Sequence, residues 1–223
     1  MRARHRHFNP KAAGAVAAYD ARFISGLSDG DNVSTWASRT GTNDATQTSV
    51  GNQPQYETNE IGGQPVVNFV AAQGDRLNIS ITIPSSVTIV AVHRRSTTGI
   101  NTINFAASTD KYALWWFDGD NVIYVKWNGV FAAFTPAQTT TGSLVVTTTK
   151  NGTTSSQVYI NGATFRAAIA PTASSGTFDR FGSTGVSNNG AIGSACLIDA
   201  FVSDGLRRRL EHAAAFSFKI ACN

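Results

Sequence analysis

Short apolar runs, broken at regular intervals by turn residues, are the feature that most constrains how this chain can fold. Between Tyr19 and Phe69 such runs alternate with Gly, Asn, Asp and Pro at intervals of about ten residues. Runs of this length suit strands rather than helices, and the turn residues between them suit antiparallel connections. The spacing therefore predicts an all-β antiparallel sandwich.

Composition indicates one domain with a substantial core. The chain has 223 residues, of which 14% are charged and 42% are hydrophobic. This length can enclose a core, and the content of Val, Ile, Phe and Trp is too high for a disordered chain. No linker or internal repeat divides the sequence. Residues 14–223 are therefore expected to form one domain, preceded by a basic N-terminal arm at residues 1–13.

The segment 86–95 is expected to be a central strand, because apolar side chains occupy both alternating sets from Val87 to Val92. Strands are also expected at residues 33–37, 65–69, 102–107, 112–118, 122–127, 131–135, 144–150, 156–160, 177–182 and 195–202.

One helix is expected near the C-terminus, from Asp204 to Ile220. Ser203 or Asp204 can cap its N-terminus. Apolar residues then follow at helical spacing: Leu206, Leu210, Ala213, Ala214 and Phe218. A helix that folds back along the preceding strand returns Cys222 to the neighbourhood of Cys196. Reduced thiols are the expected state, and a disulfide is the alternative.

Several motifs occur in an order that resembles a known family. They are Tyr19-Asp20-Ala21, Val33-Ser34-Thr35-Trp36, Asn43-Asp44-Ala45-Thr46-Gln47, Gln53-Pro54-Gln55-Tyr56 and Ile61-Gly62-Gly63-Gln64-Pro65-Val66-Val67-Asn68-Phe69. The chain resembles the concanavalin A-like lectin/glucanase (laminin G-like) jelly-roll superfamily, as found in phage structural proteins and bacterial carbohydrate-binding proteins. The resemblance implies a two-sheet antiparallel jelly-roll sandwich with one C-terminal helix, and a structural role for Trp36.

The sequence lacks the signatures of catalysis. Glucanases of the resembled superfamily carry Glu-x-Asp-x-x-Glu on one strand, and glycoside hydrolysis needs two carboxylates flanking one bond. The three glutamates are Glu57 and Glu60, expected beside a loop, and Glu211 on the helix. No nucleophile elbow, the strand-to-helix turn of serine hydrolases, is recognised in the sequence, and His93 is expected to be a partly buried structural residue. We therefore expect a protein that is not an enzyme.

Aromatic residues on two successive strands are candidates for sugar binding. Trp116, Tyr124 and Trp127 flank a turn that contains Asp118. Aromatic faces stack on sugar rings, and a nearby carboxylate can hold hydroxyl groups. Alternation places Trp116 and Tyr124 in one phase. We expect these two residues, together with Trp127 and Asp118, to bind a ligand. The alternative is that the aromatic residues belong to the core.

Two turns are candidates for calcium binding, since calcium takes oxygen ligands from loops. The preferred ligands are Asp118, Asp120 and Asn121, and the other candidate is Asp29-Gly30-Asp31-Asn32. Both tetrads are also favourable turn sequences without a metal. No other cofactor is expected.

Positive charge concentrates near the two ends of the chain, whose net charge is +4. Arg2, Arg4, Arg6 and Lys11 lie in the basic N-terminal arm, and residues 207–209 are all arginine. Because no broad basic face is predicted, nucleic acid is not an expected partner, and the arm is expected to bind a neighbouring protein. No apolar run approaches the ~18 residues of a membrane span. The first residues also lack the apolar core of a signal peptide.

These features together favour a non-enzymatic virion structural protein with a lectin-like fold. It would be a capsid decoration, fibre or tail component located in the virion. Its expected partners are other virion proteins, further copies of itself and host glycans. The alternative is a bacterial carbohydrate-binding module or lectin, which acts outside the cell or at its surface.

Overall fold

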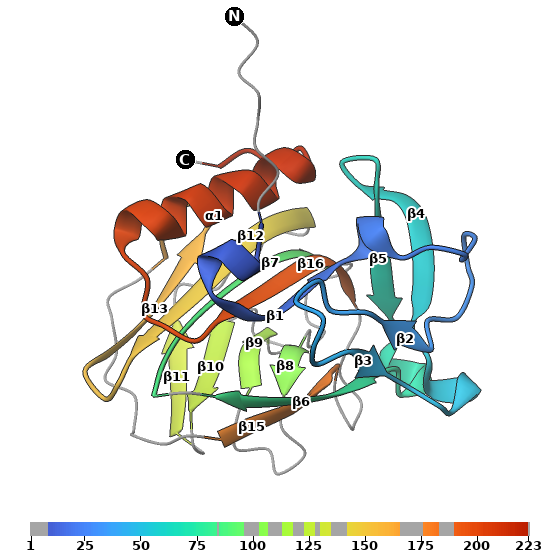
Figure 1. Ribbon diagram of the computed structural model, residues 1–223, viewed down its shortest axis with the longest axis horizontal. Helices are drawn as coiled ribbons and strands as arrows, with labels where there is room; N and C mark the ends of the chain where they lie inside the picture. Colours follow the sequence, from blue (N-terminus) through green and yellow to red (C-terminus); the bar gives the residue numbers. More distant parts are fainter. Residues whose placement is uncertain are drawn as a thin grey trace, which may run out of the picture.

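The fold is a two-sheet sandwich with a helix packed on the outer face of one sheet (Figure 1). The computed structural model describes residues 9–83, 85–95, 103–106, 113–117, 123–127, 130–134, 142–165, 176–182 and 190–222. Every strand pair is antiparallel. The predicted antiparallel sandwich with one C-terminal helix is therefore confirmed.

Each sheet contains eight strands. The first sheet runs in the order β14 (Ala163–Thr164), β13 (Ser155–Ile160), β12 (Gly142–Asn151), β7 (Ser86–Arg95), β16 (Gly190–Ile198), β5 (Gln64–Phe69) and β4 (Gln55–Ile61), with β1 (Ala15–Asp20) also paired to β16. The second sheet runs in the order β11 (Val130–Phe134), β10 (Ile123–Trp127), β9 (Ala113–Phe117), β8 (Ile103–Ala106), β15 (Gly176–Phe181), β6 (Leu77–Ile83), β3 (Ala45–Thr46) and β2 (Thr35–Trp36).

Short 3-10 turns complete the secondary structure: η1 (Lys11–Ala13), η2 (Ala21–Phe23), η3 (Val50–Asn52) and η4 (Ala71–Gln73). The α-helix of the described residues, α1, spans Asp204–Ser217. Among the described helices, none combines the length and the apolar character needed to span a bilayer.

An aromatic cluster forms the centre of the core between the sheets. The ring centroids of Tyr19 and Phe181 lie 4.7 Å apart in an edge-to-face arrangement, and Trp36 lies 5.6 Å from Tyr19. All three side chains are at most 1% exposed. The structural role expected for Trp36 is therefore confirmed.

β7 is buried on both faces, as its sequence predicts. Val87, Ile89 and Ala91 belong to the core between the sheets. Val90 and Val92 face the other way and belong to a second cluster beneath α1. His93 is fully buried on this strand, whereas the sequence predicted only partial burial, because it is flanked by Leu144 of β12 and Ile192 of β16.

Two expectations about local structure are wrong. Glu57 and Glu60, expected beside a loop, lie within β4. This strand is at the edge of its sheet and exposes Thr58 and Asn59, so it lacks the apolar alternation of a half-buried strand. The helix also ends at Ser217 rather than Ile220, since Lys219 has a positive φ of 53° that no helix continues.

A buried ion pair anchors the first half of α1. Ser203 caps the helix, and its Oγ accepts a hydrogen bond from the Leu206 backbone N–H at 3.4 Å, as predicted. Arg207 donates to both carboxylate oxygens of Glu211 at 2.7 and 2.5 Å, and its guanidinium lies 3.7 Å from the ring centroid of Tyr159 on β13. Arg207 is therefore a packing residue beneath the helix and not part of a basic surface.

Phe218 anchors the other end of the helix by filling a space that two glycines leave open. A Cβ on Gly62 would lie 2.0 Å from the Phe218 backbone oxygen, and one on Gly193 would lie 2.4 Å from the Phe218 ring. Phe218 is fully buried. Its contact with Gly193 on β16 also confirms that the helix folds back along the final strand.

The Gly193→Ala substitution should lower the free energy of unfolding by about 1–3 kcal/mol, because the new methyl group overlaps a ring that has no room to move. Gly205→Ala is the matched control, since no atom lies within 4 Å of the added Cβ on the first turn of α1. It should leave stability unchanged or raise it by up to about 1 kcal/mol. Urea unfolding of both variants measures the effect. A Gly193→Ala midpoint equal to that of the original chain would contradict the packing argument.

Candidate functional site

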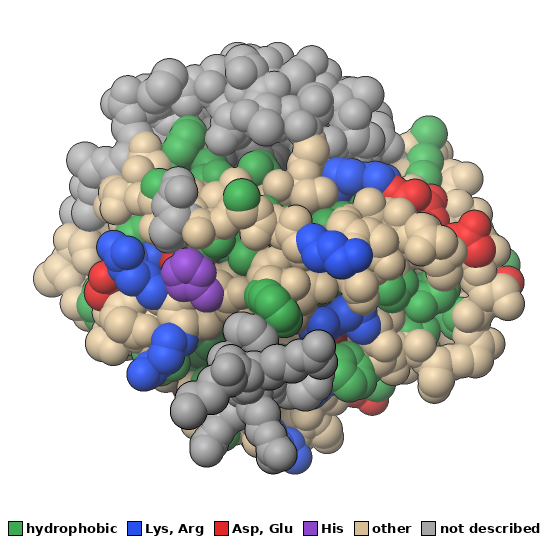
Figure 2. Space-filling model, turned by 90° about the horizontal axis from the view of Figure 1, so that it is seen from above, with side chains coloured by type: hydrophobic (Ala, Val, Ile, Leu, Met, Phe, Trp, Pro, Cys, Tyr) green, Lys and Arg blue, Asp and Glu red, His purple; other side chains and the backbone are tan. Residues whose placement is uncertain are grey.

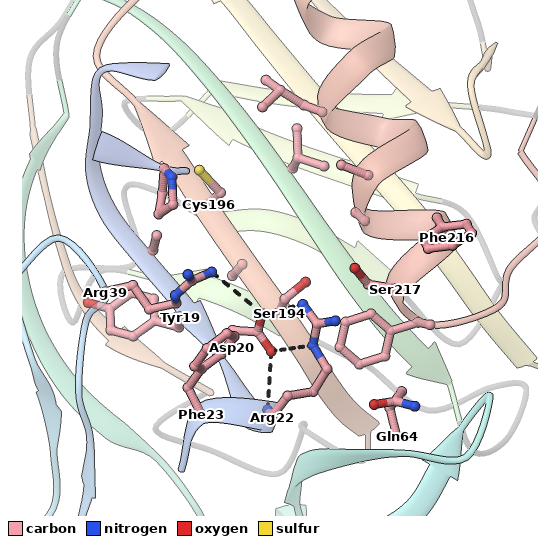
Figure 3. Close-up of a pocket in the computed structure, with 18 of the residues that line it drawn as sticks. Tyr19, Asp20, Arg22, Phe23, Arg39, Gln64, Ser194, Cys196, Phe216 and Ser217 are labelled. Atoms are coloured by element: carbon pink, nitrogen blue, oxygen red, sulfur yellow. Dashed lines mark hydrogen bonds and ion pairs between the residues drawn. The ribbon is translucent and has the colours of Figure 1, made fainter. Parts of the chain in front are cut away.

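A pocket opens on the outer face of the first sheet, between α1 on one side and β1 with η2 on the other (Figure 3). Its volume is about 730 Å³. This size lies within the range of small-molecule and sugar-binding sites. It is therefore the candidate functional site of the described residues.

Strand alternation explains why the pocket exists. β1 and β16 pair with Ala18 opposite Cys196 and Asp20 opposite Ser194. The intervening Tyr19 points into the core between the sheets, so these four residues lie on the opposite face. Their side chains are small, and the main contacts of α1 are with β7 and β12 rather than with β1. The outer face of β1 and β16 therefore stays hollow beside the helix.

Asp20 organises the charges on one wall of the pocket. Arg22 donates to both of its carboxylate oxygens, at 2.9 and 2.6 Å, and Arg39 lies 3.9 Å away (Figure 3). The Asp20 carboxylate also caps η2 by accepting a hydrogen bond from the Arg22 backbone N–H at 3.1 Å. Asp20 is 6% exposed. Because this carboxylate is held by two cations and a backbone N–H, it orders the wall rather than serving as a free base.

Two exposed phenylalanines flank the mouth of the pocket. Phe23 is 56% exposed at the end of η2, and Phe216 is 63% exposed on the last turn of α1. Figure 3 shows them on opposite sides of the pocket. The Arg39 guanidinium lies 4.0 Å from the Phe23 ring centroid, which holds both groups in place. The site therefore offers two apolar rings to solvent beside ordered cations.

The two cysteines are free thiols, and both pack against the cluster beneath α1. Cys196 lines the pocket. Its apolar surroundings raise its pKa to about 12, and the nearby Arg39 lowers the pKa by a smaller amount. The thiol therefore stays protonated at neutral pH and belongs to the apolar floor of the pocket.

The predicted sugar-binding residues lie on the other sheet. Trp116 on β9 and Tyr124 on β10 are direct cross-strand partners, in agreement with the common phase that alternation predicts for these two positions. Trp127 pairs with Val130 at the opposite end of β10. The side chains of these three aromatic residues lie outside the described part of the structure, and so does Asp118. Their role as a ligand site stays a prediction.

The predicted partner-binding arm and the preferred calcium turn also fall largely outside the described residues. The residues outside the described part include Arg2, Arg4 and Arg6 of the arm, and Asp120 and Asn121 of the turn. Lys11 is described: it lies exposed in η1. Calcium binding at Asp118, Asp120 and Asn121 remains a prediction.

The second candidate calcium turn has a structural use. Asp29 accepts hydrogen bonds from the backbone N–H and the hydroxyl of Thr58, at 2.6 and 2.9 Å. These bonds hold the pKa of the Asp29 carboxyl below its usual range. Asp31 accepts from the Ser28 backbone N–H at 2.7 Å. Within the described ranges, no group of three or more His, Cys, Asp or Glu residues gathers around a metal-sized space.

Each glutamate takes part in a local structural contact. Glu57 accepts a hydrogen bond from Asn68 at 2.7 Å, Glu60 pairs with Arg94, and Glu211 pairs with Arg207. A pair of glutamates flanking one substrate bond is not formed. The sequence does not predict the pocket. Asp20, which lines it, belongs to the motif Tyr19-Asp20-Ala21 that carries part of the family resemblance. No pattern in the sequence shows that α1 stops short of β1.

Cys196 should react with iodoacetamide at pH 8 about a thousandfold more slowly in the folded chain than in the urea-unfolded chain. The thiolate is the reactive form. Each unit by which the pKa rises, from the ordinary 9.0 to about 12, lowers the fraction of thiolate about tenfold. Mass spectrometry of the peptides measures the rate, and Cys196→Ser identifies the signal of Cys222. Because the folded state holds this proton more tightly, the stability contributed by Cys196 is present below pH 9 and is lost as the pH rises toward 12. Equal rates for the folded and unfolded chains would show that Cys196 is not in an apolar floor.

Comparisons with known proteins identify the fold. No protein-family model and no curated protein sequence matches the chain. Among solved structures, the binding domain of paraclostridial mosquitocidal protein 1 is similar, with a TM-score of 0.63 and 10% identity, over 89% of this chain and 52% of that chain. Botulinum neurotoxin type C is similar with a TM-score of 0.61 and 11% identity, over 90% and 51%. Trypanosoma rangeli sialidase with sialic acid has a TM-score of 0.52 and 15% identity, over 93% and 34%.

The chain thus spans about half the length of the toxin structures and about a third of the sialidase structure. Identities this low show a shared fold alone. The chain has a β-sandwich fold like that found in the matching parts of these structures.

Proposed function

We propose that this chain is a non-enzymatic recognition domain that binds glycans. The observation that carries the proposal is the pocket beside α1, where Phe23 and Phe216 expose their rings on either side of a small-residue floor. Aromatic rings at the mouth of a pocket stack on sugar rings, and neighbouring polar groups fix the hydroxyls. Large aromatic side chains left exposed in this way have no role in the core.

The structural neighbours support this proposal without deciding it. The paraclostridial structure is a binding domain. Botulinum neurotoxin type C needs interaction with two ganglioside molecules to enter cells, and gangliosides are glycolipids. The sialidase is an enzyme that binds sialic acid, but this chain covers only 34% of it. Because one fold can host many functions, the residues of the site carry more weight than the shared fold.

The carboxylates of the described residues favour recognition over catalysis. Glycoside hydrolysis needs one carboxyl group as an acid and a second as a nucleophile or base, both facing the substrate. Asp20 is held by two arginines, and the three glutamates are engaged with Asn68, Arg94 and Arg207. None of these groups is paired with a second carboxylate across the pocket.

The finer proposal is that this domain is a virion component, in which the basic N-terminal arm binds a neighbouring protein and the sandwich meets glycans of the host. The family resemblance and the clustered charge of Arg2, Arg4 and Arg6 support it. A bacterial carbohydrate-binding module or lectin is the alternative, and it needs no partner for the arm.

The purified chain should bind at least one ligand on a glycan array and release no reducing ends from laminarin, agar, carrageenan or alginate. The reason is that its exposed aromatic rings suit sugar stacking while its glutamates are engaged in structural contacts. Glu57→Gln and Glu60→Gln are the controls. Turnover that is lost in either variant would contradict the non-enzymatic proposal, and an array with no bound glycan would contradict the recognition proposal.

Deleting residues 2–7 should leave the melting temperature unchanged and weaken the association of the chain with further copies of itself. The reason is that the deletion removes three arginines that lie before the sandwich. The effect should be larger at low salt than at high salt, since salt screens interactions between exposed charges. Mass photometry of the full and shortened chains measures it, with Arg208→Gln as a charge-loss control on the exposed face of α1. A lower melting temperature with unchanged assembly would make the arm part of the fold rather than a tether.

A further inference from the structure

We propose that the pocket beside α1 binds a carboxylated sugar, such as a sialic or uronic acid residue of a glycan. This inference rests on the proposed glycan-binding function and adds the charge of the ligand and the place where it binds. The charges, the available donor groups and the shape of this one pocket support it.

The pocket has an excess of positive charge. Three arginines line it, namely Arg22, Arg39 and Arg209, and the carboxylate that lines it is Asp20. Figure 2 shows the molecule from the helix side, where Lys and Arg side chains are spread over the face and acidic side chains lie mainly toward its edges. A ligand with a negative charge is therefore favoured over a neutral one.

The three arginines differ in how firmly they are held. Arg22 uses two donor groups on Asp20, so it is occupied. Arg39 lies 3.9 Å from the same carboxylate, and within the described part of the chain this contact is its only ion pair. Arg209 is exposed on α1 and, among the described residues, has no ion pair. Donor groups of Arg39 and Arg209 are therefore available to a ligand from opposite walls.

A carboxylate is an anion that these donors can bind through both of its oxygens. The planar guanidinium fork forms two parallel hydrogen bonds with the two oxygens of a carboxylate. The Arg39 guanidinium is already oriented by the Phe23 ring, at 4.0 Å from its centroid. A sugar acid bound there would place its ring beside Phe23 while its carboxylate meets the guanidinium.

The remaining lining residues suit the rest of a sugar. Ser194, Ser217 and Gln64 contribute hydroxyl and amide groups that can bind sugar hydroxyls. Phe216 offers a second aromatic face on the helix side. A volume of about 730 Å³ accommodates one sugar residue and part of its neighbour.

Matched ligands test the charge directly. We expect the methyl α-glycoside of N-acetylneuraminic acid and the methyl glycoside of glucuronic acid to bind about tenfold more tightly than the methyl esters of the same glycosides, which keep the ring and lose the charge. Isothermal titration calorimetry measures the affinities, and the difference should shrink as salt is raised.

Matched variants test whether the ligand binds in the pocket beside α1. Arg209→Gln should lower the affinity for the acids at least about fivefold, and Arg208→Gln, also exposed on α1 but outside the pocket, should not. Arg39→Gln should act like Arg209→Gln, with a thermal melt to verify its folding. Phe216→Ala should weaken binding, whereas Phe201→Ala, at a 46% exposed ring outside the pocket, should not.

The outcomes separate this inference from the function on which it rests. Acids and esters that bind equally well would overturn the inference and leave glycan recognition standing. Binding of the acids that survives Arg209→Gln and Phe216→Ala but is lost in Trp116→Ala would place the sugar on β9 and β10, and would also overturn it. A chain that binds neither acids, esters nor any array glycan would overturn both proposals.

Discussion

The packing of Phe218 between Gly62 and Gly193 is the contact on which the candidate site depends. The ring fits only because Gly193 carries no Cβ, and the Phe218 backbone fits only because Gly62 carries none. It brings the C-terminal end of α1 onto the end of β16, with the Arg22 guanidinium 5.1 Å from the ring centroid. Phe216 and Ser217, the two residues before Phe218, are thereby held at the pocket. Without this contact the pocket would lose one of its walls.

The two ends of α1 are anchored by different physical means. Apolar packing holds the C-terminal end, and a buried ion pair between Arg207 and Glu211, stacked on Tyr159, holds the other. The helix therefore contacts β7 and β12 and leaves the outer face of β1 and β16 open. A site between a helix and a sheet edge is rigid on both sides, and such a site can be selective in what it binds.

The charges of the site follow from one short segment. Asp20 ends β1 on the outer face, caps η2 and holds Arg22 two residues later. Arg39 arrives from the loop after β2 and is oriented by Phe23. One buried carboxylate thus orders two cations without cancelling the charge of Arg209 on the facing helix. This arrangement explains why a pocket with an apolar floor also favours a negatively charged ligand.

The sequence by itself determined the sandwich, the buried β7, a helix cap at Ser203 or Asp204 and the common phase of Trp116 and Tyr124, because period-two alternation and turn residues act locally. It missed the edge strand β4, whose exposed polar residues carry no alternation, and it did not single out β6, although Leu77, Ile79 and Ile81 alternate. The tertiary structure alone decided the pocket. Its residues come from β1, η2, β16 and α1. These elements surround one pocket because the contacts of Phe218 with Gly62 and Gly193 hold the end of α1 against the sheet.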